Sequence, residues 1–273
     1  METLLIFLRG LLMGMADAVP GVSGGTIAFI TGIYHRLIHA ISKIHISLLI
    51  KGNFKKFYKN LDLKLFIPLG AGIAIALFTF SKLMGYLLTN KPSLTFAFFF
   101  GLILASPVVL FKSIGKIDLK KISFAVIGFV GAYLLSSPTT FQINHSLPFI
   151  FLAGAIAICA MILPGISGAF LLLLLGQYHY IITAIHEFNF KILAVFGLGA
   201  LTGILAFSKL LDYLMHHFKS LVLSFLIGLM LGSLRIPIAK VVEDGSMNIL
   251  VLLLGVLGFL LVFIMEWYFA KKV

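Results

Sequence analysis

Two short phrases of proline, glycine and serine interrupt the apolar sequence, and their residue types suit the binding of an anion. The first is VPGVSGG, from Val19 to Gly25, and the second is LPGISGA, from Leu163 to Ala169. Proline removes a backbone donor and glycine adopts dihedrals that other residues avoid, so each phrase predicts a helix that breaks and restarts. A restarting helix presents free N–H groups and a partial positive charge, which favour an anion such as a phosphate group.

The residues of the two phrases divide into those that break the helix and those that would bind. The breaks are predicted at Pro20 and Gly21, and again at Pro164 and Gly165. A serine caps a helix start or donates to an anion. Hydroxyl and backbone donors are therefore expected from Ser23, Gly24, Gly25, Thr26, Ser167 and Gly168. A single phrase is equally compatible with a kinked packing helix, whereas two copies favour binding.

The two phrases belong to a long internal repeat. The first phrase and its continuation to His35 match the second and its continuation to His179 at an offset of 144. Further along, FSKLMGYLL (80–88) matches FSKLLDYLM (207–215) at an offset of 127. Two matches in the same order indicate a duplication. We therefore expect one transmembrane domain over 1–273, built from repeats 1–138 and 145–273.

The composition indicates a membrane protein. Hydrophobic residues make up 61% of the 273 residues and charged residues only 11%, whereas soluble domains are about half apolar and about a quarter charged. Helices are expected, because an unclosed strand cannot satisfy its backbone in lipid. The fold class is thus an all-α polytopic membrane protein in which each repeat has a broken or re-entrant hairpin and three spanning helices. Its apolar runs lie near 3–19, 22–41, 64–90, 93–111, 122–137, 147–163, 166–186, 191–216, 219–237 and 247–270.

The basic residues predict the sidedness of the chain. Seven lie in 36–64, four in 112–121, two at the C-terminus and one at Lys219, fourteen in all against four in the alternate loops. This bias places both termini in the cytoplasm. The net charge of +12 is explained by these loops, so nucleic-acid binding is not expected. Five segments per half give the halves opposite orientations, as in many secondary transporters.

Lysines at matching positions lie inside the apolar runs of both halves. Lys82 and Lys209 correspond at the offset of 127, and Ser81 and Ser208 precede them. A lysine near the bilayer centre costs about 2.5–3.5 kcal/mol on insertion scales, so a partner such as an anionic head group is expected. The alternative is that the long side chains reach the membrane surface. Arg9 in the first apolar run could also bind phosphate through its planar guanidinium.

Three titratable residues are candidates for coupling transport to an ion gradient. Asp17 lies just before the first break, and Met161 stands at its place in the second half. His35 and His179 end the matched phrases and could titrate, although anchoring at the membrane surface is the more common role of such residues. The single Cys159 forms no metal cluster, and no hydrolase triad is recognisable. We expect no metal and no cofactor.

The segments RGLLMGMADAVPGVSGGTIAFITGIYHRLI and ICAMILPGISGAFLLLLLGQYHYI resemble the bacterial and archaeal polyprenyl-phosphate transporter family. The resemblance implies a translocase, and not an enzyme, that returns undecaprenyl phosphate to the cytoplasmic leaflet for cell-wall synthesis. It implies the polyprenyl-phosphate lipid as partner and the cytoplasmic membrane as location. A homodimer and coupling to protons or sodium are both compatible with the sequence. The alternatives are an intramembrane lipid-phosphate enzyme and a transporter or channel for small anions.

Overall fold

The part of the chain that the structure describes is helical and contains no strand, as predicted. This computed structural model describes residues 2–17, 23–44, 52–136, 145–245 and 248–270. The first half contains α1 (Glu2–Asp17), α2 (Gly24–Ile30), α3 (Tyr34–Ser42), α5 (Phe54–Asn60), α6 (Leu63–Asn90), α7 (Pro92–Phe111) and α8 (Leu119–Leu135). The second half contains α9 (Leu147–Ile162), α10 (Gly168–Leu174), α11 (Tyr178–His186), α12 (Phe190–His217), α13 (Lys219–Ser233), α14 (Arg235–Glu243) and α15 (Ile249–Ala270).

Among the residues that the structure describes, four helical stretches are long and apolar enough to cross a membrane. They are Leu63–Phe80, Pro92–Phe111, Phe190–His217 and Lys219–Glu243, and two shorter apolar helices cover Leu147–Ile162 and Ile249–Ile264. This confirms the prediction of an all-α polytopic membrane protein.

The apolar runs 22–41 and 166–186 each contain two helices, a detail that the sequence reading did not anticipate. The first run holds α2 and α3, of seven and nine residues, and the second holds α10 and α11, of the same lengths. The turns between them contain Gly32 (φ +75°) and Gly176 (φ +64°), a conformation that glycine adopts without a steric penalty. Both turns use the same bond: the Ile33 N–H donates to Ala28 O, and the Gln177 N–H donates to Leu172 O.

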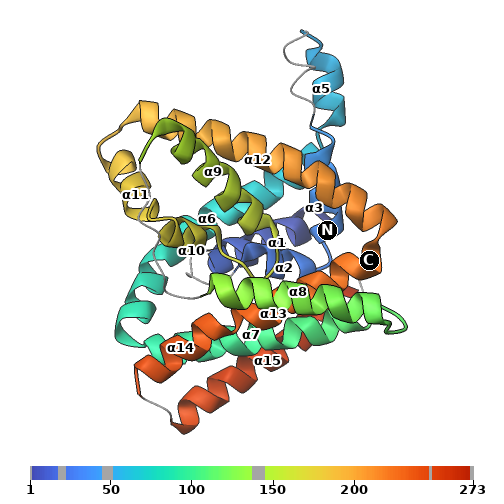
Figure 1. Ribbon diagram of the computed structural model, residues 1–273, viewed down its shortest axis with the longest axis vertical. Coiled ribbons are helices and arrows are strands. Elements are labelled where there is room, and N and C mark those ends of the chain that lie inside the picture. The colour runs from blue at the N-terminus through green and yellow to red at the C-terminus, as the bar shows by residue number, and fades with distance from the viewer. Residues whose placement is uncertain (1, 18–22, 45–51, 137–144, 246–247, 271–273) are drawn as a thin grey trace.

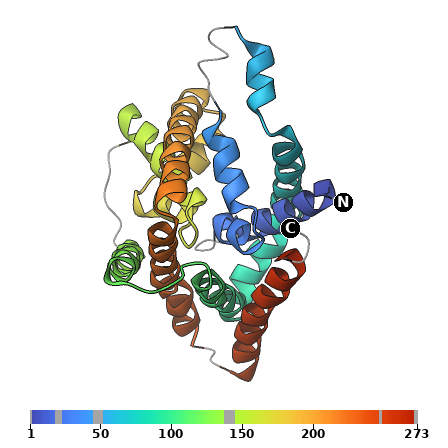
Figure 2. The ribbon, with the colours of Figure 1, turned by 90° about the vertical axis from the view of Figure 1, so that its right-hand side faces the viewer.

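The helices pack in pairs that correspond between the two halves. In one half α1 packs on α6, and in the other α9 packs on α12. The remaining pairs cross between the halves, since α7 packs on α15 and α13 packs on α8. Figure 1 shows α8, α13, α7 and α15 as one row and α9 and α12 across the other part of the molecule, with α1 and α2 between them. In Figure 2 the start of α1 and the end of α15 lie on the same side.

Glycines at equivalent positions set the close contacts of these pairs. A Cβ at Gly72 of α6 would collide with the Phe7 carbonyl, and one at Gly199 of α12 would collide with the Phe151 carbonyl. Gly72 and Gly199 correspond at the offset of 127, and Phe7 and Phe151 correspond at the offset of 144. A Cβ at Gly101 of α7 would likewise collide with the Gly255 carbonyl, and one at Gly228 of α13 would collide with the Ala125 carbonyl. The same close contacts therefore recur at matching positions of the two halves.

These contacts can be tested with glycine-to-alanine substitutions. We expect Gly228→Ala to lower the free energy of unfolding by about 1–3 kcal/mol, because the methyl group must push α13 away from the α8 backbone. Gly197→Ala in α12 is the matched control, since its Cβ would meet nothing within 4 Å and alanine favours a helix. The apparent melting temperature of the purified protein in detergent measures both. An equal loss of stability in the two variants would contradict the role given to the α13–α8 contact.

Candidate functional site

The start of α2, which follows the first predicted break, meets the second break in the interior of the protein. Ser23, only 1% exposed, is the N-cap of α2 and accepts a hydrogen bond from the Gly25 N–H at 3.1 Å. Its hydroxyl also lies within donating distance of two carbonyls at the end of α9, Met161 O at 3.3 Å and Leu163 O at 3.2 Å. One serine thus joins the start of a helix in the first half to the end of a helix in the second.

A second contact runs in the opposite direction, because here the donor belongs to the second half and the acceptor to the first. The Gly165 N–H donates to the Thr26 hydroxyl at 2.9 Å, and Thr26 is 1% exposed. The backbones are so close that a Cβ at Gly25 would lie 2.7 Å from Ile162 O. Gly165 itself has φ +88° and lies against the backbone of Met230 in α13. Only a residue without a side chain fits these two positions.

The start of α2 already holds a negatively charged group, the carboxylate of Asp17. The Gly24 N–H donates to Asp17 Oδ1 at 2.7 Å, and the Gly25 N–H is taken by Ser23. A carboxylate at a helix start is favourable for the reasons that favour phosphate there. The second half has no such carboxylate, because Met161 occupies the matching position.

The remaining predicted residues are more scattered than the two breaks. Ser167 is buried and Gly168 begins α10 against α9, whereas Lys209 is exposed on α12. Ser208 is fully buried and its hydroxyl donates to Leu205 O within its own helix. Lys82 lies on α6, but its side chain and that of Ser81 fall outside the described part, as do Pro20 and Gly21.

Arg9 is buried in the middle of α1. Its electrostatic neighbours are Arg36 and Glu2. Arg36 forms a two-pronged ion pair with Asp62, the N-cap of α6, at 2.9 and 3.2 Å, and it also binds Glu2 at 2.6 Å. The Arg36 guanidinium holds the pKa of the Asp62 carboxyl below its usual range. These contacts tie α3 to the starts of α1 and α6.

A polar cluster that the sequence reading missed joins α3 to α12. His39 Nδ1 lies 3.2 Å from both carboxylate oxygens of Asp212, and the Ser42 hydroxyl donates to Asp212 Oδ2 at 2.9 Å. His216 Nδ1 lies 3.5 Å from Asp212 Oδ1. The ligand atoms of the two histidines and the aspartate lie within 4.8 Å of one another, so among the described residues this group could hold a metal ion.

This cluster has no counterpart in the other half. Gly85, Thr89 and Thr183 stand at the positions equivalent to Asp212, His216 and His39. The packing differs accordingly: α12 packs extensively on α3, whereas in the described part of the chain α6 and α11, the equivalent pair, form no comparable contact. In the described part of the chain, one side of the molecule therefore has an extensive contact between the two halves, of α3 with α12, that has no equivalent on the other side.

The two histidines predicted for coupling lie at the surface. His35 and His179 are both exposed. His35 has Lys219, His216 and Asp212 as electrostatic neighbours, so it lies beside the polar cluster of α3 and α12. The sequence did contain a signal for this cluster, because Asp212 is the charged mismatch, opposite Gly85, in the otherwise matching segments 80–88 and 207–215.

Comparison with known proteins places this arrangement in a family. Residues 13–265 match the family described as VCA0040-like, undecaprenyl phosphate translocase-like. The chain belongs to this family. Within the family match lie both breaks and the polar cluster of α3 and α12.

Two curated relatives cover most of the chain. A polyprenyl-phosphate transporter of Vibrio cholerae serotype O1 is 40% identical over 86% of this chain and 77% of its own length. A polyprenyl-phosphate transporter of Staphylococcus aureus is 33% identical over 93% of this chain and 92% of its own length. No solved structure matches the chain significantly. The family membership confirms the resemblance drawn from the two proline–glycine–serine phrases.

The contact between the breaks predicts a specific loss of stability. We expect Thr26→Val to lower the free energy of unfolding by about 1–3 kcal/mol, because the buried Gly165 N–H loses its acceptor. Thr31→Val is the matched control. Thr31 is also buried, but its hydroxyl donates only to Ile27 O at 2.8 Å and Ala28 O at 3.4 Å, and both carbonyls already accept from backbone N–H groups. Melting temperatures of both variants in detergent give the comparison. Equal stability of the Thr26 variant and wild type would show that this bond contributes nothing.

Proposed function

We propose that this protein transports polyprenyl phosphate, with undecaprenyl phosphate as its substrate, from the outer to the cytoplasmic leaflet of the cytoplasmic membrane. There the lipid carrier re-enters cell-wall precursor synthesis. Two relatives are named polyprenyl-phosphate transporters. The observation that carries the proposal is the meeting of the two breaks, where Ser23 and Thr26 bond to the backbone of 161–165. Hydroxyl and N–H donors in an otherwise apolar interior suit a small anionic head.

The transporter is proposed to consist of two inverted repeats, 1–138 and 145–273, with both termini in the cytoplasm. Inverted repeats with broken helices at the midplane are a common plan of secondary transporters. Helices α1 and α9 have sixteen residues each, which is roughly 24 Å and shorter than the hydrocarbon core of about 30 Å. We infer that each leads into a re-entrant hairpin and that the two hairpins meet from opposite sides.

The phosphate is proposed to bind where the breaks meet, in competition with Asp17. The donors are those of Ser23, Gly24, Gly25 and Thr26 in one half and of Ser167 and Gly168 in the other. Lys82, Lys209 and Arg9 are the proposed source of the positive charge that attracts the head group. Because Asp17 and phosphate seek the same Gly24 N–H, a proton on Asp17 weakens the competitor and favours the substrate. This gives proton coupling a physical route.

The one-sided packing of α3 on α12 is proposed to be the closed gate of one transport state. With the termini in the cytoplasm, the ends of α3 and α12 that carry His39 and Asp212 face the cytoplasm. The α6–α11 side then faces outward, where α6 and α11 lack a comparable contact in the described part of the chain. If α3 separated from α12 and α11 packed on α6 instead, the cytoplasmic side would open. This is the change expected for alternating access between inverted repeats.

Reconstitution tests the function directly. In liposomes that carry labelled polyprenyl phosphate in one leaflet, we expect the purified protein to accelerate transfer to the other leaflet. Inorganic phosphate flux in liposomes without polyprenyl lipid would indicate a small-anion transporter instead. Release of inorganic phosphate from the lipid would indicate an enzyme.

The same assay tests the competition with Asp17. We expect a proton gradient to change the wild-type transfer rate, and Asp17→Asn to transfer lipid at a rate that no longer responds to the gradient. Asparagine keeps an oxygen for the Gly24 N–H but cannot titrate. Glu187→Gln, an exposed carboxylate on the C-cap of α11, is the control and should respond like wild type. An Asp17→Asn variant that still follows the gradient would remove Asp17 from coupling.

The gate can be tested by the accessibility of α3. In a Cys159→Ser background, Ala40→Cys places a thiol at a position that is 5% exposed. We expect Asp212→Ala to raise the maleimide labelling of this thiol about fivefold. A change of this size corresponds to the loss of about one hydrogen bond that stabilises the closed side. Glu243→Ala, which removes the exposed ion pair with Lys240, is the control. Unchanged labelling after Asp212→Ala would show that the cluster does not hold α3 against α12.

A further inference from the structure

Two apolar cavities occupy equivalent places in the two halves. The first, of about 380 Å³, lies between α1, α2, α6, α7 and α15, and the second, of about 530 Å³, lies between α8, α12 and α13. Seven lining positions of the first recur in the second at the offset of 127: 84, 87, 91, 94, 95, 98 and 99 match 211, 214, 218, 221, 222, 225 and 226. The duplication has thus preserved a cavity as well as the helices around it.

Both cavities begin at the place where the breaks meet. Ala16 and Ile27, which line the first cavity, are the sequence neighbours of Asp17 and Thr26. Leu163, which lines the second, supplies a carbonyl within hydrogen-bonding distance of the Ser23 hydroxyl. From there the first cavity extends toward Lys91, at the end of α6, and the second toward Phe218, at the end of α12. In the proposed orientation these two ends lie on opposite sides of the membrane.

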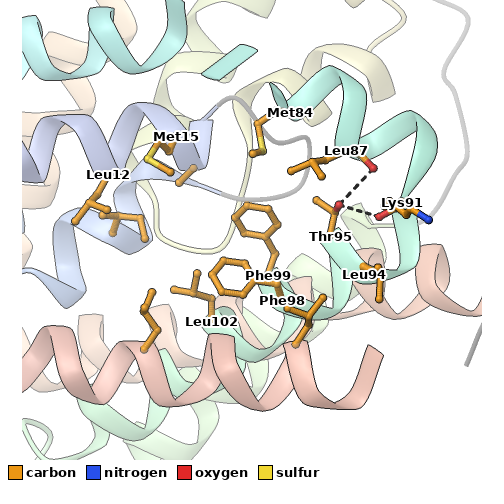
Figure 3. A pocket seen from close by; sticks show the side chains of 14 residues that line it. Leu12, Met15, Met84, Leu87, Lys91, Leu94, Thr95, Phe98, Phe99 and Leu102 are labelled. Carbon is orange, nitrogen blue, oxygen red and sulfur yellow. Dashed lines mark hydrogen bonds between the residues drawn. The ribbon is translucent and has the colours of Figure 1, made fainter. Parts of the chain in front are cut away.

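The cavities suit a hydrocarbon chain and not a soluble ligand. The lining of the second is apolar throughout, and the first has only Thr95 and Lys91 as polar residues. The Thr95 hydroxyl donates back to Lys91 O at 2.8 Å, and Figure 3 shows the Lys91 ammonium pointing away from the cavity. Phe98 and Phe99 lie across from Leu12 and Met15 in the same view, so the space is bounded by aliphatic and aromatic groups.

We propose that these cavities hold the head-proximal part of the isoprenoid tail, the first cavity in the outer leaflet and the second in the cytoplasmic leaflet. The inference rests on the proposed function, because it places the phosphate between the two cavities at the meeting of the breaks. The tail would leave the first cavity and enter the second as the head passes from one side to the other. The rest of the long chain stays in lipid, which requires each cavity to open laterally.

A third cavity provides the contrast. It has about 330 Å³ and an apolar lining, but it lies between α7, α14 and α15 and borders none of the break residues. It is as apolar as the first two cavities, but its position keeps it off the path of a lipid whose head lies at the breaks. Ile238 lines it and is exposed, so a large side chain there fills the third cavity alone.

Photo-crosslinking tests the proposal on the wild-type protein. The probe is polyprenyl phosphate with a diazirine in its first isoprene units, added to the protein in lipid nanodiscs. We expect adducts on 84–102 and on 207–226, reduced by unlabelled polyprenyl phosphate and not by phosphatidylglycerol. Adducts confined to other segments, or equal reduction by phosphatidylglycerol, would overturn the assignment.

Tryptophan substitutions test it in the transport assay. Leu87→Trp and Leu214→Trp occupy equivalent positions in the two cavities and should each slow leaflet transfer about tenfold, because part of the tail can no longer be buried. Ile238→Trp should transfer like wild type. Wild-type rates in both cavity variants, with correctly folded protein, would refute the tail sites alone. Failure of the wild-type protein to move the lipid would instead refute the proposed function, and the tail sites with it.

Discussion

A backbone that leaves its helix at membrane depth must have its N–H and C=O groups satisfied by protein, because lipid offers no hydrogen bonds. In this protein the two broken segments satisfy each other. Ser23 joins the start of α2 to the carbonyls at the end of α9, and Thr26 accepts from Gly165. The close approach of Gly25 to Ile162 O follows from the same pairing. The start of α2 and the end of α9 thus depend on each other in the interior, so the proposed binding chemistry and the fold depend on one interface.

The rest of the architecture holds that interface in place. Helices α7 and α8 of the first half pack on α15 and α13 of the second, so each half completes the helix row of the other. Glycines at matching positions bring these pairs close enough for extensive contact. The two apolar cavities lie between this row and the hairpins, which is why they border the breaks. The proposed substrate, with a charged head and an apolar tail, would find both environments side by side.

The sequence predicted the elements well and the partnerships less well. Apolar runs gave the helices, and the repeated proline, glycine and serine gave the breaks, because these signals are local. The turns at Gly32 and Gly176 were missed, since an apolar run of twenty residues looks like one helix by composition. The bond of Asp17 to Gly24 and the cluster around Asp212 depend on which side chains meet after folding. His39 and Asp212 are separated by 173 residues, and no local pattern joins them. The exposure of Lys209 was equally invisible in a helix that is apolar on all sides.

The differences between the halves carry as much meaning as their likeness. If two inverted repeats were identical, a state closed on one side and its mirror state would have the same free energy, and the empty protein would populate both equally. Here the α3–α12 side has Asp212, His39 and Ser42, and the equivalent side has Gly85 and Thr183 in place of the first two. In the proposed transport cycle these bonds would form in only one of the two states and would therefore bias the empty protein toward it. At the proposed binding site, Asp17 of the first half corresponds to Met161 of the second, which adds a second difference between the halves. In the proposed cycle, a lipid phosphate that displaces Asp17 would disturb the first half and not the second, so the two states would be unequal before the substrate binds.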